Sequence, residues 1–263
     1  NFHKMIDINP YNFLAINVPL TFQQGIIGDG EETPHGLGRL IAMAEKAGIA
    51  CGLLDAHRLK MSMEEVYTQL RLLRPTLVGL NPTSLNIPEA VVIGQMCDEL
   101  DIPYIVGGIA VTLELLKCRE VFPNAYCLVR GNGEGVIVPL VKAIVNGTNV
   151  NLPGLNFKGG HHCSETYAVV VPPEFIPPFN QAKYVEEPVY THQTRLWNGT
   201  PLIINEANTF VTYGCPFQCR FCSSPMMVGL GKKDINGKTM IPYMRAPMQK
   251  IVDEVESLLD LGA

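Results

Sequence analysis

Three cysteines stand at Cys-x3-Cys-x2-Cys spacing in the stretch Tyr213-Gly214-Cys215-Pro216-Phe217-Gln218-Cys219-Arg220-Phe221-Cys222. The apolar run at residues 209–212 comes directly before it and predicts a strand that leads into a loop. A tight loop at the end of a strand can point three thiolates at one centre. Structural zinc sites usually take four ligands, so three cysteines better suit an iron–sulfur cluster with one iron left open. Ordinary reduced cysteines, or half of a zinc site, are the alternatives.

The composition is that of a globular protein with one large domain or two ordinary ones. The 263 residues are 47% hydrophobic and 17% charged, which is enough apolar material for a sizeable core. The net charge of -5 gives no basic footprint for nucleic acid or for an anionic membrane. We find neither a signal-peptide pattern nor an apolar run of membrane-spanning length. The eight cysteines are too unevenly spaced for a disulfide scaffold, so we expect a reducing, cytoplasmic location.

The first half of the chain alternates between strand and helix patterns. This alternation is typical of an α/β protein with a parallel sheet and helices on both faces. Ser62 and Glu65 form a capping box that predicts the start of one helix. Strands are expected at residues 13–18, 49–55, 76–80, 104–108 and 126–130, and helices at residues 36–48, 62–74 and 88–100 and from residue 134 to about residue 145.

The composition of the sequence changes between residues 146 and 201, where prolines become frequent. Six prolines and the pair Gly159-Gly160 interrupt any long element there, so we interpret this stretch as a connector with short strands. The predicted division is therefore a sheet domain at residues 1–147, a connector at 148–200 and a second part at 201–263. A final helix is expected at residues 247–261. Its apolar residues fall on one side: Ile251, Val252, Val255, Leu258 and Leu259.

Small and polar residues follow three of the predicted strands. Ligands of open parallel sheets bind beyond the carboxyl ends of the strands, where small residues let the backbone approach a large planar cofactor. These loops predict a nucleotide-like or cofactor site; alternatively, their glycines serve only tight turns and close helix packing. The Glu134 carboxylate either caps the following helix or accepts a hydrogen bond from the cofactor. The candidate cofactor contacts are Asn81, Thr83, Ser84, Leu85, Gly107, Gly108, Ala110, Gly131, Asn132 and Glu134.

These motifs together resemble a known enzyme family. The cysteine spacing, with an aromatic residue before the last cysteine, resembles the signature of radical S-adenosylmethionine enzymes. An ordered series of motifs precedes it and resembles the cobalamin-binding domain found ahead of many such cores. The resemblance covers roughly residues 10 to 260. The series comprises Gly36-Leu37-Gly38, Leu54-Asp55-Ala56, Val78-Gly79-Leu80, Val106-Gly107-Gly108, Arg130-Gly131-Asn132-Gly133-Glu134 and Leu152-Pro153-Gly154-Leu155.

The resemblance implies a fold and three cofactors. The fold would be a doubly wound, Rossmann-like parallel sheet followed by the beginning of a partial (β/α) barrel. Cys215, Cys219 and Cys222 would hold a 4Fe-4S cluster whose free iron chelates S-adenosylmethionine, with Phe221 against the adenine. Cobalamin would lie in the sheet domain, with the lower face of its cobalt near Leu85.

The resemblance also implies an activity. The leading expectation is methyl transfer to an unactivated carbon, or to phosphorus, on a small-molecule substrate of specialised metabolism. The alternative is a radical cyclisation or rearrangement without methyl transfer. An external donor such as a flavodoxin or ferredoxin would supply electrons, and no nucleic acid or membrane partner is expected. Because only 41 residues follow Cys222, we expect a piece of a longer protein or a cofactor-binding module without catalytic ability.

Several other residues of chemical interest have simpler interpretations. Asp55-Ala56-His57 resembles the start of a motif that supplies an axial histidine to cobalt, but Lys60 departs from that motif, so we interpret His57 as a loop residue. His161-His162-Cys163 follows two glycines and is best explained as an exposed turn. Arg245 either lies near S-adenosylmethionine or simply starts the last helix.

The remaining cysteines lie in apolar strand or helix patterns. We expect them to be small buried hydrophobic side chains rather than ligands. They are Cys51, Cys97, Cys118 and Cys127.

Overall fold

The computed structural model describes most of the chain. The described residues are 11–21, 33–159, 167–185, 190–195, 197–215, 217, 219–223 and 243–263. The turn expected at His161-His162-Cys163 lies outside them.

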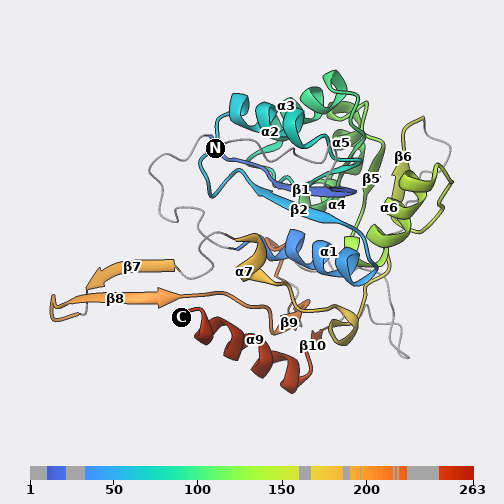
Figure 1. Cartoon of the computed structure of the whole chain (residues 1–263). Coiled ribbons are helices and arrows are strands. Elements are labelled where there is room, and N and C mark those ends of the chain that lie inside the picture. Colours follow the sequence, from blue (N-terminus) through green and yellow to red (C-terminus); the bar gives the residue numbers. More distant parts are fainter. Residues whose placement is uncertain are drawn as a thin grey trace.

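A six-stranded sheet forms the centre of the fold (Figure 1). Its strand order is β2-β1-β3-β4-β5-β6; the first five strands are parallel, and β6 pairs antiparallel with β5 at one edge. Order β2-β1-β3 reverses the winding direction next to β1, which makes the sheet doubly wound. The strands of this sheet are β1 (Phe13–Asn17), β2 (Cys51–Asp55), β3 (Val78–Leu80), β4 (Tyr104–Val106), β5 (Cys127–Val129) and β6 (Leu155–Phe157).

Helices cover both faces of the sheet. Helices α2, α3, α4 and α5 pack on one face and α1 and α6 on the other, each side with its own apolar core. The α/β fold class predicted from the sequence is therefore confirmed. The helices of this part are α1 (His35–Lys46), α2 (Met63–Leu73), α3 (Ile87–Glu99), α4 (Gly108–Leu113), α5 (Leu115–Val121), the short turn η1 (Gly133–Gly135) and α6 (Ile137–Asn146).

The central strand shows why the sheet needs two covered faces. Phe13 and Ala15 point into the core under α1 and α6, whereas Leu14 and Ile16 point into the core on the opposite face. Successive strand residues alternate between faces, and all four are buried, so this strand is apolar throughout instead of alternating with polar residues.

The predicted capping box is also confirmed. The Ser62 hydroxyl accepts a hydrogen bond from the Glu65 backbone N–H at 3.2 Å, and the Glu65 carboxylate accepts one from the Ser62 N–H at 2.8 Å. Two N–H groups that the first turn of α2 would leave unpaired are thus satisfied.

The stretch expected to be a connector also contributes a strand to the central sheet. Its first strand, β6, completes the central sheet, so the sheet extends beyond residue 147. The Arg119 guanidinium donates a hydrogen bond to Asn156 on this strand at 3.0 Å, and Asn156 is buried. The later elements of the stretch are η2 (Pro173–Phe175), α7 (Gln181–Tyr184) and a hairpin of β7 (Tyr190–Arg195) and β8 (Pro201–Glu206), which extends away from the sheet in Figure 1.

The last part of the chain packs below α1 in Figure 1. The strand expected at residues 209–212 begins later, because β9 (Thr212–Tyr213) pairs with β10 (Met244–Arg245) over only two residues. The final helix is present as α9 (Met248–Asp260), but most of its apolar side is exposed: Leu258 is buried, whereas Val252, Val255 and Leu259 are not. Within the described residues, no helix combines the length and apolar character needed to cross a membrane.

Candidate functional site

A cavity of about 250 Å³ opens at the carboxyl ends of β3, β4 and β5, on the face covered by α1 and α6. Parallel strands leave a crevice at this edge where the winding reverses, so the cavity lies where the fold places ligands. Its lining is Phe13, Gly36, Leu37, Arg39, Leu40, Gly79, Leu80, Asn81, Thr83, Ile105, Gly107, Gly108, Ile109, Val129, Gly131, Asn132, Gly133, Glu134, Val136, Ile137 and Leu140. We call it the sheet-edge pocket.

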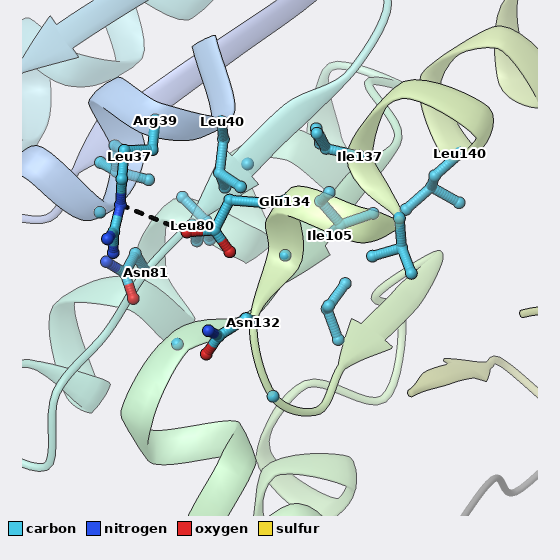
Figure 2. Close-up of a pocket in the computed structure, with 18 of the residues that line it drawn as sticks. Leu37, Arg39, Leu40, Leu80, Asn81, Ile105, Asn132, Glu134, Ile137 and Leu140 are labelled. Carbon is cyan, nitrogen blue, oxygen red and sulfur yellow. Dashed lines mark ion pairs between the residues drawn. The ribbon is translucent and has the colours of Figure 1, made fainter. Parts of the chain in front are cut away.

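The sheet-edge pocket has a polar end and an apolar end. Figure 2 shows Arg39, Asn81 and Glu134 together at one end and Ile137 and Leu140 at the other. Small-molecule sites usually measure roughly 300–1,000 Å³ and combine apolar walls with a few convergent polar groups. The pocket has that character but is slightly smaller, so it fits one arm of a large cofactor better than a whole one.

The polar end depends on a glycine that brings two loops together. Gly108 has a φ of +80°, and a Cβ built on it would lie only 1.7 Å from Oδ1 of Asn81. A side chain at this position would therefore be strained and would also displace Asn81. The positive φ favours glycine here, and the missing side chain leaves room for the Asn81 amide at this end of the pocket.

The structure brings most of the predicted cofactor contacts to this pocket. Seven of them line it: Asn81, Thr83, Gly107, Gly108, Gly131, Asn132 and Glu134. Three do not. Ser84 and Leu85 are exposed on the loop after β3, and the Ala110 side chain is buried in the core on the opposite face of the sheet.

Glu134 has a partner that the sequence analysis did not consider. Its carboxylate Oε1 lies 3.2 Å from Nε of Arg39 on α1, and the Glu134 side chain is only 5% exposed (Figure 2). The Nε–H is not aligned with the oxygen, so within the described residues Arg39 Nε is buried without a hydrogen bond. The pair is therefore electrostatic, and this buried donor has no hydrogen-bond acceptor within the described residues.

Arg39 also contacts the chain that leads into the cysteine loop. Its guanidinium carbon lies 4.4 Å from the centre of the Tyr213 ring and 5.0 Å from the centre of the Phe210 ring. Both distances are within cation–π range. Burial raises the pKa of Tyr213, so its hydroxyl is neutral at pH 7 and its ring faces a positive charge. A single side chain thus touches the sheet-edge pocket and the start of the cysteine loop.

Sequence reasoning did not identify Arg39, because nothing in the sequence around α1 points to its distant partners. The partners Tyr213 and Phe210 are more than 170 positions away, and only the fold brings them together.

A small polar cleft of about 30 Å³ lies on the other side of Arg39, with room for about one water molecule. Its lining includes His35, Arg39, Tyr213, Lys250 and Glu254. Burial, and then the charge of Arg39, lower the pKa of His35 to about 4, so this imidazole is neutral at pH 7. Burial also lowers the pKa of Lys250, whose ammonium donates to the Pro173 carbonyl at 3.1 Å.

None of the three cysteines of the loop forms a disulfide bond within the described residues. Cys219 and Cys222 are exposed and Cys215 is half-buried, and the Cys222 N–H donates to the Cys219 carbonyl at 3.1 Å in a tight turn. Among the described residues, no three His, Cys, Asp or Glu side chains are gathered closely enough to hold a metal ion. The donor set itself, three cysteine thiols within eight residues, has the chemistry of an iron–sulfur ligand set. Metal binding is often coupled to ordering of the loop that supplies the ligands.

The other described cysteines differ sharply from these three. Cys51, Cys97, Cys118 and Cys127 are buried, as expected. Burial raises the pKa of Cys97 and of Cys127 to about 12 and that of Cys118 to about 11. A thiol becomes a metal ligand as the thiolate, so these buried groups are poor candidates.

Three further predicted residues have clear positions. Phe221 is 94% exposed on the cysteine loop, without a protein partner that would fix its ring among the described residues. His57 does not line the sheet-edge pocket; its Nδ1 accepts a hydrogen bond from the Leu20 N–H at 3.2 Å, as suits a loop residue. Arg245 is exposed on β10, opposite Thr212, and does not start α9.

Known proteins resemble this chain in sequence and in fold. No protein-family model matches the chain. It is 27% identical over 245 residues, 88% of its length, to an anaerobic magnesium-protoporphyrin IX monomethyl ester cyclase of Cereibacter sphaeroides. It is 25% identical over 214 residues, 78% of its length, to the enzyme of the same name from Rubrivivax gelatinosus. The chain spans 36% and 35% of these two curated relatives.

Two solved structures share the fold over 95% of the chain. One is the radical S-adenosylmethionine methyltransferase TsrM from Kitasatospora setae, solved with cobalamin and a [4Fe-4S] cluster, with a TM-score of 0.62 and 21% identity. The other is the cobalamin-dependent S-adenosylmethionine radical enzyme OxsB in an apo form, with a TM-score of 0.64 and 15% identity. The chain covers 46% of the first and 31% of the second. The resemblance found in the sequence is therefore confirmed, and this chain has the fold of the cobalamin-dependent radical S-adenosylmethionine enzymes.

Proposed function

We propose that this chain binds cobalamin and a 4Fe-4S cluster as part of a cobalamin-dependent radical S-adenosylmethionine enzyme. One observation carries the proposal: Arg39 lines the sheet-edge pocket and also contacts the ring of Tyr213, two residues before the first cysteine. A cofactor in the pocket would therefore lie near the start of the cysteine loop, which suits a reaction that uses both sites.

The sheet-edge pocket supports cobalamin by its shape and chemistry. Its apolar end, with Ile105, Ile137 and Leu140, suits the flat aromatic base on the nucleotide tail of a corrinoid. Its polar end, with Asn81 and Asn132, can hydrogen-bond the rest of the tail. The corrin ring itself would remain outside a cavity of about 250 Å³ and face the cysteine loop.

Cys215, Cys219 and Cys222 would hold the cluster and leave one iron open to S-adenosylmethionine. When bound, the cluster and cobalamin supply one-electron reduction of the sulfonium and a carrier for a methyl group. The protein contributes alignment and protection. The paired charges of Arg39 and Glu134 make the wall between the two sites polar. Both side chains are mostly buried, so this wall would also shield the sites from water.

For the overall reaction we propose methyl transfer to an unactivated carbon, or to phosphorus, on a small molecule of specialised metabolism. An external flavodoxin or ferredoxin would supply the electrons, and a reducing cytoplasm would protect the exposed thiols. Radical cyclisation is the second candidate, and one observation favours it: both curated relatives carry the name of a cyclase.

Anaerobic reconstitution tests the cofactor assignment. The protein is treated with ferrous iron, sulfide and hydroxocobalamin, desalted, and examined by visible absorption and by iron and sulfide analysis. Bound corrinoid together with a cluster supports the proposal. Protein that retains neither after desalting would overturn it.

Labelled S-adenosylmethionine separates the two reactions before any substrate is known. The reconstituted protein is reduced and given S-adenosylmethionine with a deuterated methyl group, and the bound corrinoid is analysed by mass spectrometry. Methyl transfer predicts deuterated methylcobalamin on the protein. Corrinoid that stays unmethylated while 5′-deoxyadenosine accumulates would instead support cyclisation.

A further inference from the structure

Arg39 forms the wall between the two cavities described above. Among the described residues, it is the only one that lines both the sheet-edge pocket and the small polar cleft beside Tyr213. Its side chain is 20% exposed, so it is largely enclosed by the groups it touches. A change in the position of the Arg39 side chain would therefore alter the lining of both cavities.

The contacts of Arg39 divide into two sets. On one side is Glu134, which sits in η1 at the polar end of the sheet-edge pocket. On the other side are the rings of Tyr213 and Phe210. Tyr213 ends β9 and stands two positions before Cys215, the first cysteine of the loop.

A guanidinium suits this double role better than any other side chain. It stays charged at all relevant pH values, and its flat faces stack on aromatic rings while its edge meets a carboxylate. Lysine keeps the charge but has no flat face to stack on Tyr213. Methionine keeps much of the length but neither charge nor hydrogen-bond donor.

The buried Nε of Arg39 adds a second, independent observation. Within the described residues it makes no hydrogen bond, although Glu134 is 3.2 Å away. A buried donor left in this state is costly, and a polar group of a ligand in the pocket would satisfy it. Binding would then tighten the position of the guanidinium, and so of the rings stacked on it.

We propose that Arg39 is a positioning residue that holds the start of the cysteine loop against the sheet-edge pocket, so that cobalamin binding and ordering of Cys215 favour each other. This inference rests on the proposed function, because it takes the pocket ligand to be cobalamin. Such coupling is reciprocal and typically changes an affinity by about 5- to 150-fold.

The test measures how fast Cys215 reacts with iodoacetamide in the cluster-free, reduced protein, with and without saturating hydroxocobalamin. Peptide mass spectrometry reports each cysteine separately. In the native protein, hydroxocobalamin is expected to slow alkylation of Cys215 at least about fivefold. In Arg39→Met this protection is lost, and Arg39→Lys restores only part of it.

Two matched variants keep the test decisive. Glu134→Gln removes the carboxylate but keeps its shape, so it should weaken the protection without the loss of packing that Arg39→Met entails. Arg119→Met removes a guanidinium from α5, which packs on the opposite face of the sheet, and should leave the protection intact. Circular dichroism checks that each variant is folded; if Arg39→Met is not, Arg39→Lys and Glu134→Gln carry the comparison.

The outcomes separate the inference from the proposed function. If the native protein does not bind hydroxocobalamin, the proposed function fails, and the inference fails with it. If it binds but Cys215 is not protected, or if Arg39→Met protects as well as the native protein, the inference alone is overturned.

Discussion

Asn81 follows β3, Gly108 begins α4 after the neighbouring strand β4, and a Cβ on the glycine would lie 1.7 Å from the amide oxygen of the asparagine. Gly108 also has a φ of +80°, which L side chains rarely adopt. The polar end of the sheet-edge pocket therefore depends on the absence of one carbon atom.

Substitution of Gly108 by alanine should damage both stability and binding. The left-handed backbone costs alanine about 1–2 kcal/mol, and displacement of Asn81 adds to that loss. We expect the affinity for hydroxocobalamin to fall at least about tenfold, a loss of about 1.4 kcal/mol. Urea unfolding and equilibrium dialysis measure the two effects.

Gly48→Ala is a matched control for this variant. Gly48 has nearly the same φ, +77°, but nothing within 4 Å of its added Cβ. It should lose only the backbone contribution of about 1–2 kcal/mol and bind hydroxocobalamin normally. Equal binding by Gly108→Ala and the native protein would show that the Asn81 contact does not shape the site.

The Arg39–Glu134 pair should be measurable in a double-mutant cycle. Glu134→Gln leaves the mostly buried guanidinium without its counter-charge, which should cost about 1–3 kcal/mol in urea unfolding. In an Arg39→Met background the same change should cost much less, because the charge that Glu134 balances is gone. Additive losses in the double variant would mean that the two charges do not interact.

Stability should fall as the pH is lowered below about 6.5, partly because of His35. Its pKa is about 4 in the folded protein, mainly through burial, against an ordinary value of 6.5. Between these values the unfolded chain binds more protons than the folded one, so the free energy of unfolding decreases as pH falls. His35→Phe should therefore lose less stability than the native protein from pH 6.5 to pH 4.

Urea unfolding at several pH values checks this difference. The comparison uses the difference in the free energy of unfolding between the two proteins, because other groups titrate in the same pH range. Parallel pH profiles for His35→Phe and the native protein would contradict the prediction.

Substitution of a proposed cluster ligand should reduce iron binding, whereas substitution of a buried cysteine should not. The native protein should bind about four iron atoms per chain after anaerobic reconstitution, and Cys219→Ala should bind far fewer. Cys97→Ala is the control, because burial raises the pKa of this thiol to about 12 and keeps it from acting as a thiolate. Iron analysis and the visible spectrum provide the measurement; a full cluster in Cys219→Ala would count against the assignment.

The sheet domain was largely predictable because its signals are local. Buried strands such as residues 13–17 are nearly continuous apolar runs, and the capping box of Ser62 and Glu65 predicts the start of a helix. The glycine- and asparagine-rich loops could be assigned to one edge of the sheet because parallel strands end there together. These features need no knowledge of which distant segments touch.

Other features depend on long-range contacts and could not be predicted. Strand β6 joins the sheet antiparallel because Asn156 and its neighbours pair with β5, whereas the proline-rich surrounding sequence suggested a connector whose short strands stay outside the sheet domain. The Ala110 side chain turns into the core because α4 begins immediately after β4. The Arg39–Tyr213 contact joins segments from opposite ends of the chain.

Helix α1 contacts two different parts of the protein. One side buries Leu37, Ile41 and Ala44 in the core against the sheet, and the other presents His35 and Arg39 to Phe210 and Tyr213. A protein engineer who replaces the segment after residue 201 on this sheet would therefore have to redesign the outer surface of α1. Recombination between such proteins should succeed more often when that helix and the segment around Tyr213 are inherited from the same parent.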